Sequence, residues 1–299
     1  MWFKNLRIYR LTGTVDVSVD RLETELAKHA FVPCGKAEFS RFGWVPPLGR
    51  HGEMLTHAVG PFTMICARRQ EKILPAAAIN EMVDEKVEAF EAAEARSIYR
   101  RERIRLKDEV VLTLLPRALT RSSLMYAYFD TQQKLLIIDA ATPAKAEDFL
   151  ESLRAVLVEL PVVPLVVQSD VSDILTRWVE HGAPQRFDLD DECELQSRRE
   201  SRNVVRCRNQ ELESAEILSH LKAGKRVMQL AAVWRQAIRF VLSEDLAIKR
   251  LRFEDKIRNE AEGPDDDEVA QFDQDFAVMT VQLRAFIDDL VSEFGGLEE

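Results

Sequence analysis

The amino-acid sequence predicts an α+β fold, in which antiparallel sheets and long helices occupy separate stretches of the chain. Apolar residues recur at helical spacing from residue 76 to about 102, and again from 266 to 293. Short runs that alternate between apolar and polar side chains are separated by turn signals, which is typical of antiparallel strands. The last three of these runs, from residue 225 onward, predict an antiparallel meander.

The first half of the chain alternates between predicted strands and helices. Pro75 suits the first turn of one long helix over 76–102, and Pro116 ends the next predicted helix. Gly60 and Pro61 supply a turn before a short β-rich run. We expect strands at 3–11, 62–67, 124–129 and 135–140, and helices at 18–30, 76–102, 107–115 and 143–159.

An apolar, proline-containing run at 160–165 marks a boundary in the chain. The 299 residues are about twice a typical domain length, so we expect two α+β regions, 1–160 and 161–299. The second region should hold the meander and an acidic terminal helix. Its expected elements are helices at 170–180, 214–223 and 266–293, and strands at 186–195, 203–208, 225–234, 236–242 and 247–253.

The charge of the chain is unevenly distributed. The formal net charge is −10, from 41 basic and 51 acidic residues. Residues 259–299 hold 13 of the acids and one base, Arg284, which gives this segment a net charge of −12. The preceding 258 residues hold 40 bases and 38 acids, a net charge of +2. The body of the protein is therefore free to carry basic faces.

Several functional classes lack their sequence signatures. No apolar stretch approaches the roughly eighteen residues that span a bilayer, and the first residues lack the order of a signal peptide, so we expect a cytoplasmic protein without a membrane partner. The nucleotide-binding, nucleophile-elbow and zinc-helix motifs are missing, so we assign no cofactor, metal or catalytic residue. The cysteines are far apart and form no CxxC, which favours buried thiols: Cys34, Cys66, Cys193 and Cys207.

The acidic residues leave one alternative open, a metal-dependent nuclease or another recombination enzyme that uses acidic clusters. Acidic clusters at 188–192 and 265–268 could in principle bind magnesium. Consecutive carboxylates diverge around a helix start or alternate across a strand, so they rarely converge on one ion. We therefore interpret both clusters as solvated surface or helix capping.

Several basic clusters favour a DNA partner, although each alone is more often a solvated surface. If the long helix persists, four of its bases fall on one stripe: Arg96, Arg100, Arg103 and Lys107. Arg206 and Arg208 share one face of a strand. No base-reading motif accompanies them, so we expect binding to the phosphate backbone without sequence preference. The basic candidates are Arg96, Arg100, Arg103, Lys107, Arg117, Arg121, Arg206, Arg208, Lys225 and Arg226, and Arg198, Arg199 and Arg202 extend the last strand cluster.

Short motifs along the whole chain are specific rather than generic. They are Met1–Leu6, Gly43–Pro47, Ile65–Arg68, Glu71–Pro75, Leu106–Val110, Leu114–Ala118, Lys145–Asp148, Leu160–Leu165 and Lys249–Phe253. Together they resemble the RdgC family of bacterial recombination-associated proteins. The resemblance implies a non-enzymatic, nucleoid-associated protein whose elongated, multi-lobed subunits form a homodimeric ring. This ring encircles double-stranded DNA in a basic hole and restrains recombination promoted by RecA.

The resemblance also implies roles for two segments. A finger that contacts DNA maps onto residues 206–210, which include Gln210, and Asn209 stands where relatives have a lysine. A gate between subunits maps onto residues 114–121, where Leu119 replaces the aromatic residue of some relatives. A third hypothesis is a protein that contacts RecA directly and touches DNA incidentally. Whether single-stranded DNA is bound as well stays open at this point.

Overall fold

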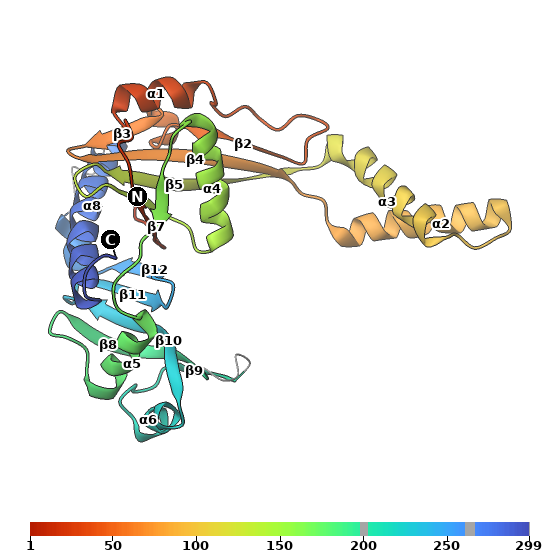
Figure 1. Ribbon diagram of the computed structural model, residues 1–299. Helices are drawn as coiled ribbons and strands as arrows, with labels where there is room; N and C mark the ends of the chain where they lie inside the picture. The colour runs from red at the N-terminus through yellow and green to blue at the C-terminus, as the bar shows by residue number, and fades with distance from the viewer. Residues whose placement is uncertain (198–202, 261–266, 299) are drawn as a thin grey trace.

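The computed structural model describes residues 1–197, 203–260 and 267–298. Two antiparallel sheets form the body, helices cover their faces, and a pair of helices projects far from one end of the first sheet (Figure 1). The predicted α+β class with antiparallel sheets is confirmed.

The first sheet has the strand order β2-β4-β5-β6-β1-β7, and β3 pairs with the inner half of β4. Helices α1 (Val19–Ala27) and α4 (Pro143–Val156) pack on one face of it, where Trp44 stacks edge-on against Phe149. The strands are β1 (Arg7–Leu11), β2 (Ser40–Val45), β3 (Thr56–Val59), β4 (Phe62–Lys72), β5 (Thr120–Asp130), β6 (Leu135–Ile138) and β7 (Val162–Pro164).

The second sheet has the strand order β12-β11-β10-β8-β9. Helices α5 (Val171–His181) and α6 (Ala215–Lys222) contribute to the core on its buried face. The predicted meander is present, because β10, β11 and β12 are consecutive antiparallel neighbours. The strands are β8 (Phe187–Ser197), β9 (Val204–Arg208), β10 (Lys225–Trp234), β11 (Ile238–Ser243) and β12 (Ile248–Phe253).

Helix α8 (Glu268–Glu293) packs against both sheets. Its apolar side belongs to one continuous core with residues of β4, β5 and β10, so the two halves of the chain share their interior. Arg284 of α8 donates two hydrogen bonds of 2.7 Å to the buried Asp130 at the end of β5. The short helix α7 (Asp255–Glu260) comes between β12 and the residues that precede α8.

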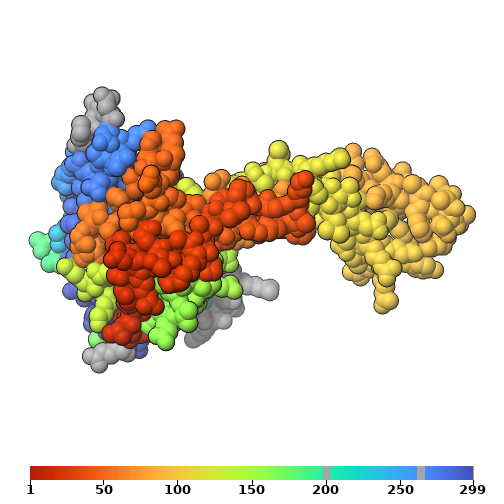
Figure 2. Space-filling view, turned by 90° about the horizontal axis from the view of Figure 1, so that it is seen from above, coloured from red at the N-terminus to blue at the C-terminus, as the bar shows by residue number. Residues whose placement is uncertain are grey.

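The projection, which we call the arm, consists of α2 (Ala76–Glu94), α3 (Arg100–Leu114) and the 3₁₀ turn η2 (Leu115–Arg117). The two helices pack on each other through a small core of their own, at Ile79, Val83, Val87 and Val110. Both views show the arm standing clear of the body, connected to it by β4 and β5 (Figure 2).

The prediction of one helix over 76–102 is wrong. Helix α2 ends at Glu94, Ala95 adopts a left-handed conformation with φ of 51°, and α3 begins at Arg100 and folds back on α2. The helix predicted at 107–115 is the second part of α3. The apolar spacing continues across the break because both helices bury residues in the same small core.

Several predicted strand ends also differ from the structure. Strands β4 and β5 extend to Lys72 and Thr120, well beyond the apolar runs that predicted them, because pairing with each other and with β2 continues outside the core. The opening strand is shorter than predicted, since β1 starts at Arg7. Helix α8 begins after Asp267, whose carboxylate accepts hydrogen bonds from the backbone N–H groups of Val269 and Ala270.

Candidate nucleic-acid interface

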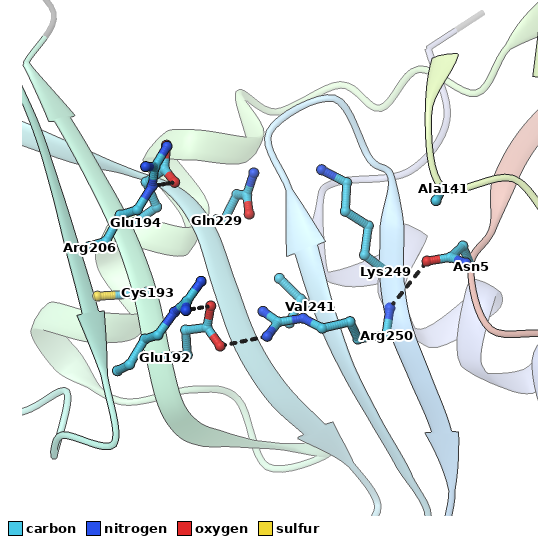
Figure 3. Close-up of a pocket in the computed structure, with 11 residues that line it drawn as sticks. Asn5, Ala141, Glu192, Cys193, Glu194, Arg206, Gln229, Val241, Lys249 and Arg250 are labelled. Atoms are coloured by element: carbon cyan, nitrogen blue, oxygen red, sulfur yellow. Dashed lines mark hydrogen bonds and ion pairs between the residues drawn. The ribbon is translucent and has the colours of Figure 1, made fainter. Parts of the chain in front are cut away.

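The exposed face of the second sheet carries a ladder of charged side chains (Figure 3). Arg206 and Arg208 of β9 flank the buried Cys207, so both guanidinium groups point to the exposed face, as the strand period predicts. Arg206 Nε lies 2.7 Å from Glu194 Oε2, and Arg208 Nε lies 3.4 Å from Glu192 Oε1. In the cross-strand register of β8 and β9, Glu194 lies directly opposite Arg206, and Glu192 lies directly opposite Arg208.

Glu192 also binds an arginine from the other edge of the sheet. Arg250 Nη1 of β12 lies 2.7 Å from Glu192 Oε2. The hydrogen bond from Arg250, with a smaller contribution from Arg208, lowers the pKa of Glu192 below its ordinary value. The carboxylate therefore stays ionised at neutral pH and is shared between two cations.

These side chains surround a cavity of about 410 Å³. Its charged lining consists of four basic residues and two carboxylates, so positive charge is in excess. The polar lining is completed by Asn5 and Gln229. The charged residues are Arg206, Arg208, Lys249, Arg250, Glu192 and Glu194. The arrangement can hold an anionic group, because the guanidinium groups are fixed in place and remain partly exposed.

Sequence reasoning missed Lys249, Arg250 and Arg252 as site residues. From Arg250 to Phe253, exposed basic residues alternate with buried apolar ones, and this alternation is the sequence signal that could have identified them. Three strands, β11, β10 and β8, lie between β12 and β9 in the sheet, and no local sequence pattern indicates that side chains of β9 and β12 meet on the exposed face.

Asn209 and Gln210 lie away from this cavity. Asn209 has φ of 51° and ends β9, and Gln210 donates a 2.9 Å hydrogen bond to Glu216. Both line a separate cavity of about 760 Å³ whose charged lining is acidic. The structure thus divides the predicted finger segment between two surfaces. Arg198, Arg199 and Arg202 lie outside the described residues.

Lys225 and Arg226 have structural partners. Lys225 is only 7% exposed, and its ammonium group donates hydrogen bonds to the backbone and side-chain oxygens of Asn203. Arg226 Nε lies 3.3 Å from Asp173 Oδ1 of α5. Both residues were expected to bind DNA, as Arg206 was, but in the structure they hold the start of β10 against Asn203 and α5.

The expected basic stripe on the arm does not include Arg96. Arg96 lies in the turn between α2 and α3, not on the helix, and its guanidinium binds both carboxylate oxygens of Glu102 at 3.0 and 2.8 Å. Arg103 pairs with Asp84 of α2. Arg100 and Lys107 are exposed and form no ion pair with any residue that the structure describes.

The predicted gate residues lie where the arm returns to the first sheet. Leu119 is 77% exposed, and its carbonyl accepts a 2.8 Å hydrogen bond from the N–H of Ile73, whose side chain is also exposed. Arg121 Nη2 lies 3.4 Å from Glu71 Oε2. Arg117 is exposed on η2 and has no ion-pair partner within 1–197, 203–260 and 267–298. An apolar residue thus stands between two bases on an open surface.

The acidic clusters do not converge in the described part of the chain. Asp190 pairs with Arg239 at 2.8 Å, and Asp267 caps α8, whereas Asp265 and Asp266 lie outside the described residues. Among the residues that the structure describes, no three His, Cys, Asp or Glu side chains are placed to hold a metal ion. Of the four cysteines, three are buried thiols and Cys34 is half-buried.

The family model described as "Putative exonuclease, RdgC" matches residues 1–297. The chain belongs to the RdgC family. It is 43% identical over 298 residues to the recombination-associated protein RdgC of Tolumonas auensis, covering 99% of both chains. It is 42% identical over 301 residues to that of Aeromonas hydrophila, covering 100% of this chain and 99% of the relative. The RdgC protein of Yersinia pestis is 43% identical over 298 residues, with 99% and 98% covered.

The names of these RdgC relatives associate them with recombination, whereas the description of the family model names a nuclease activity. The family resemblance expected from the motifs is confirmed along the whole chain. Within the described residues, no helix is both long and apolar enough to cross a membrane.

Proposed function

We propose that this RdgC-family protein binds double-stranded DNA without sequence preference and so limits the access of RecA. The observation that carries the proposal is the row of cations around the cavity on the second sheet, where Arg206, Arg208 and Arg250 expose guanidinium groups. Guanidinium groups in fixed positions suit phosphate oxygens. The recombination-associated names of the relatives agree with a DNA ligand.

The proposed binding follows the physics of phosphate neutralisation. Each cation that contacts a phosphate releases condensed counterions, so affinity falls steeply as salt increases. The contacts reach the backbone and not base edges, so affinity should vary little between sequences. We assign the exposed bases of β9, β12 and the arm to this surface, and Asn209 and Gln210 to its margin.

We further propose that two copies of the chain close into a ring around the duplex in the nucleoid. The exposed Leu119, set between Arg117 and Arg121, would form one of the two contacts that closure requires. A ring holds DNA by topology as well as by charge, so dissociation is slower than the ion pairs alone would allow. A protein held in this way occupies the duplex and keeps the recombinase from it.

The test is duplex affinity measured against salt concentration, by fluorescence anisotropy, for the wild type and for the double variant Arg206→Glu/Arg208→Glu. The double variant should weaken binding to every sequence and lower the salt slope by about two, one for each contact removed. The control is Arg21→Glu on α1, an exposed base on the far side of the first sheet, which should change neither quantity.

Three outcomes would contradict the proposal. A flat salt response or a strong preference for one sequence would exclude backbone binding. A monomer at every concentration in sedimentation would exclude the ring. Degradation of DNA in the presence of magnesium or manganese would support the nuclease alternative, since a binding protein leaves both strands intact.

A further inference from the structure

A second, larger cavity adjoins the charged ladder. It has a volume of about 830 Å³ and is lined by residues 1–5, by Arg250–Phe253 of β12, and by Arg258 of α7. Asn5 and Arg250 line both cavities, so the two hollows are neighbours on one surface. The expected DNA-binding residues do not include any residue of this second cavity, which we call the Trp2 groove.

The wall of the groove is a well-anchored piece of chain. The segment before β1 runs antiparallel to β12, and Leu6 and Ile248 exchange backbone hydrogen bonds of 2.7 and 3.1 Å. The N–H of Leu251 donates to the carbonyl of Lys4 at 2.8 Å. Asp139 accepts a 2.8 Å hydrogen bond from the N–H of Asn5. Side chains on this segment therefore have a defined position relative to those of β12.

The groove is positively charged. Its lining includes Lys4, Arg250, Arg252 and Arg258 and no carboxylate among the residues that the structure describes. Lys4, Arg252 and Arg258 form no ion pair with any described residue, whereas Arg250 is tied to Glu192. Three cations with no such partner around one hollow favour a ligand with repeated negative charges.

Trp2 gives the groove an aromatic surface. Three of the four tryptophans are buried, with 2% of Trp44, 6% of Trp178 and 1% of Trp234 exposed. Trp2 is partly exposed, lines the groove, and packs against Phe253 with ring centroids 4.6 Å apart. Phe253 supports the indole, which leaves its outer part open to the cavity.

We propose that the Trp2 groove binds single-stranded nucleic acid, with phosphates held by Lys4, Arg252 and Arg258 and a base stacked on Trp2. A basic groove that contains an exposed aromatic ring is the combination that single-strand binding uses, because every unpaired base offers a face for stacking. A base inside a duplex has both faces covered. The proposal builds on the proposed DNA-binding function and shares Arg252 of β12 with it, but Trp2, Lys4 and Arg258 lie outside the surface assigned to duplex DNA, so the two can fail separately.

Intrinsic tryptophan fluorescence tests the proposal on the full chain, with oligo(dT) as the probe. Because the other three tryptophans are buried, stacking on Trp2 should quench the emission as oligo(dT) is added. Heparin, a polyanion without bases, should bind the cations but leave the emission nearly unchanged. Equal quenching by both, or none by oligo(dT), would overturn the stacking of a base.

Three variants separate the contribution of the Trp2 ring from that of the basic side chains. Trp2→Leu keeps an apolar contact with Phe253 and should weaken oligo(dT) binding at least about fivefold, since one stacked base contributes about 1–3 kcal/mol. Trp2→Phe keeps a ring and should retain most of the affinity while losing the quenching. Lys4→Glu/Arg252→Glu should lower the salt slope for oligo(dT) by about 1.4, because each contact with a single-stranded phosphate contributes about 0.7.

Measurements of duplex affinity distinguish single-strand binding in the Trp2 groove from the proposed binding of duplex DNA. Arg206→Glu/Arg208→Glu should weaken duplex binding, whereas Trp2→Leu should leave it close to the wild-type value. If Trp2→Leu leaves oligo(dT) affinity unchanged, the groove is not a single-strand site even when duplex binding is intact. If Trp2→Leu instead shifts the sedimentation of the free protein towards monomer, the groove is a contact between two copies of the chain.

Discussion

Glu192 illustrates how single residues set the charge of the proposed DNA surface. One carboxylate holds Arg208 from β9 and Arg250 from β12, and both guanidinium groups remain more than half exposed. A phosphate that approaches this face must compete with the carboxylate for the same donors. Glu192 therefore positions two arginines and at the same time reduces their attraction for a polyanion.

This competition predicts that Glu192→Gln binds duplex DNA several-fold more tightly than the wild type. The glutamine keeps a hydrogen-bond acceptor for the arginines but removes one negative charge from the face. The measurement is fluorescence anisotropy at low salt, with Glu25→Gln on α1 as a matched control that also loses a carboxylate paired with a cation. Weaker binding by Glu192→Gln would mean that the carboxylate increases DNA affinity by positioning the two arginines more than it lowers that affinity by competing with phosphate.

The sequence predicted the direction of side chains correctly where the two-residue period of a strand determines it. It did not predict the burial of a side chain whose partner is distant in the sequence. Arg206 and Arg208 point to one face because they are two residues apart in β9. Lys225 was expected on the surface, but Asn203, from the end of the β8–β9 connection, buries its ammonium group. No local pattern around Lys225 contains that information.

At the scale of elements, the arm shows how a helix can break without glycine or proline. Ala95 takes the left-handed conformation, and the Glu102 side chain accepts the N–H of Tyr99 at 2.9 Å to close the first turn of α3. Arg96 clamps the same carboxylate and lies over the rings of Phe90 and Tyr99. The sequence predicted one helix because the apolar spacing continues and the contacts that fold α3 back are side-chain contacts.

We predict that Glu102→Gln loosens the turn of the arm. The hydrogen bond from Arg96, followed by that from the Tyr99 N–H, lowers the pKa of Glu102 from 4.5 to about 2. A depressed pKa means that the contribution of this carboxylate to stability is complete above pH 4.5 and is lost as the pH falls towards 2. Hydrogen exchange at the start of α3 should therefore be faster in Glu102→Gln at neutral pH.

The matched control is Glu109→Gln, an exposed residue of the same helix whose carboxylate has only a 3.7 Å ion pair with Lys86. It should exchange like the wild type, and strands β4 and β5 should be unaffected in both variants. Unchanged exchange at the start of α3 in Glu102→Gln would show that the small core of the arm holds the turn without this clamp.

At the scale of the whole molecule, the acidic terminal segment has a structural role. Asp289 of α8 accepts a 2.9 Å hydrogen bond from Trp234 and binds Arg186 and Arg235, and Asp130 binds Arg284. The sequence revealed the charge imbalance, but it could not show that part of it is neutralised by arginines of the body. The sequence predicted two α+β regions, but it could not show that the two sheets share one core through α8.

The joint between α8 and the first sheet predicts a large effect of Asp130→Asn. Asp130 is 2% exposed and forms a two-point ion pair with Arg284, whose side chain is also largely buried. Removing the charge leaves the guanidinium without a partner of opposite sign, which should cost about 3 kcal/mol. Urea denaturation followed by circular dichroism measures the loss.

Asp148→Asn is the control, because Asp148 pairs with Arg69 at 2.7 Å on an exposed surface and should cost less than about 1 kcal/mol. Equal unfolding midpoints for the two variants would show that α8 is held on the sheet by its apolar contacts alone.

The long strands β4 and β5 give the molecule the mechanics of a cantilever. Their inner residues, at the Phe62 end of β4 and the Asp130 end of β5, are buried in the body, whereas the outer residues are half-buried in β4 and exposed in β5. The outer five residues of each strand reach about 17 Å further, at about 3.3 Å per residue, before the helices begin. A small bend in these two strands produces a large displacement of the tip of the arm. Such a bend would change the position of the arm relative to the body while the contacts in the core stay intact.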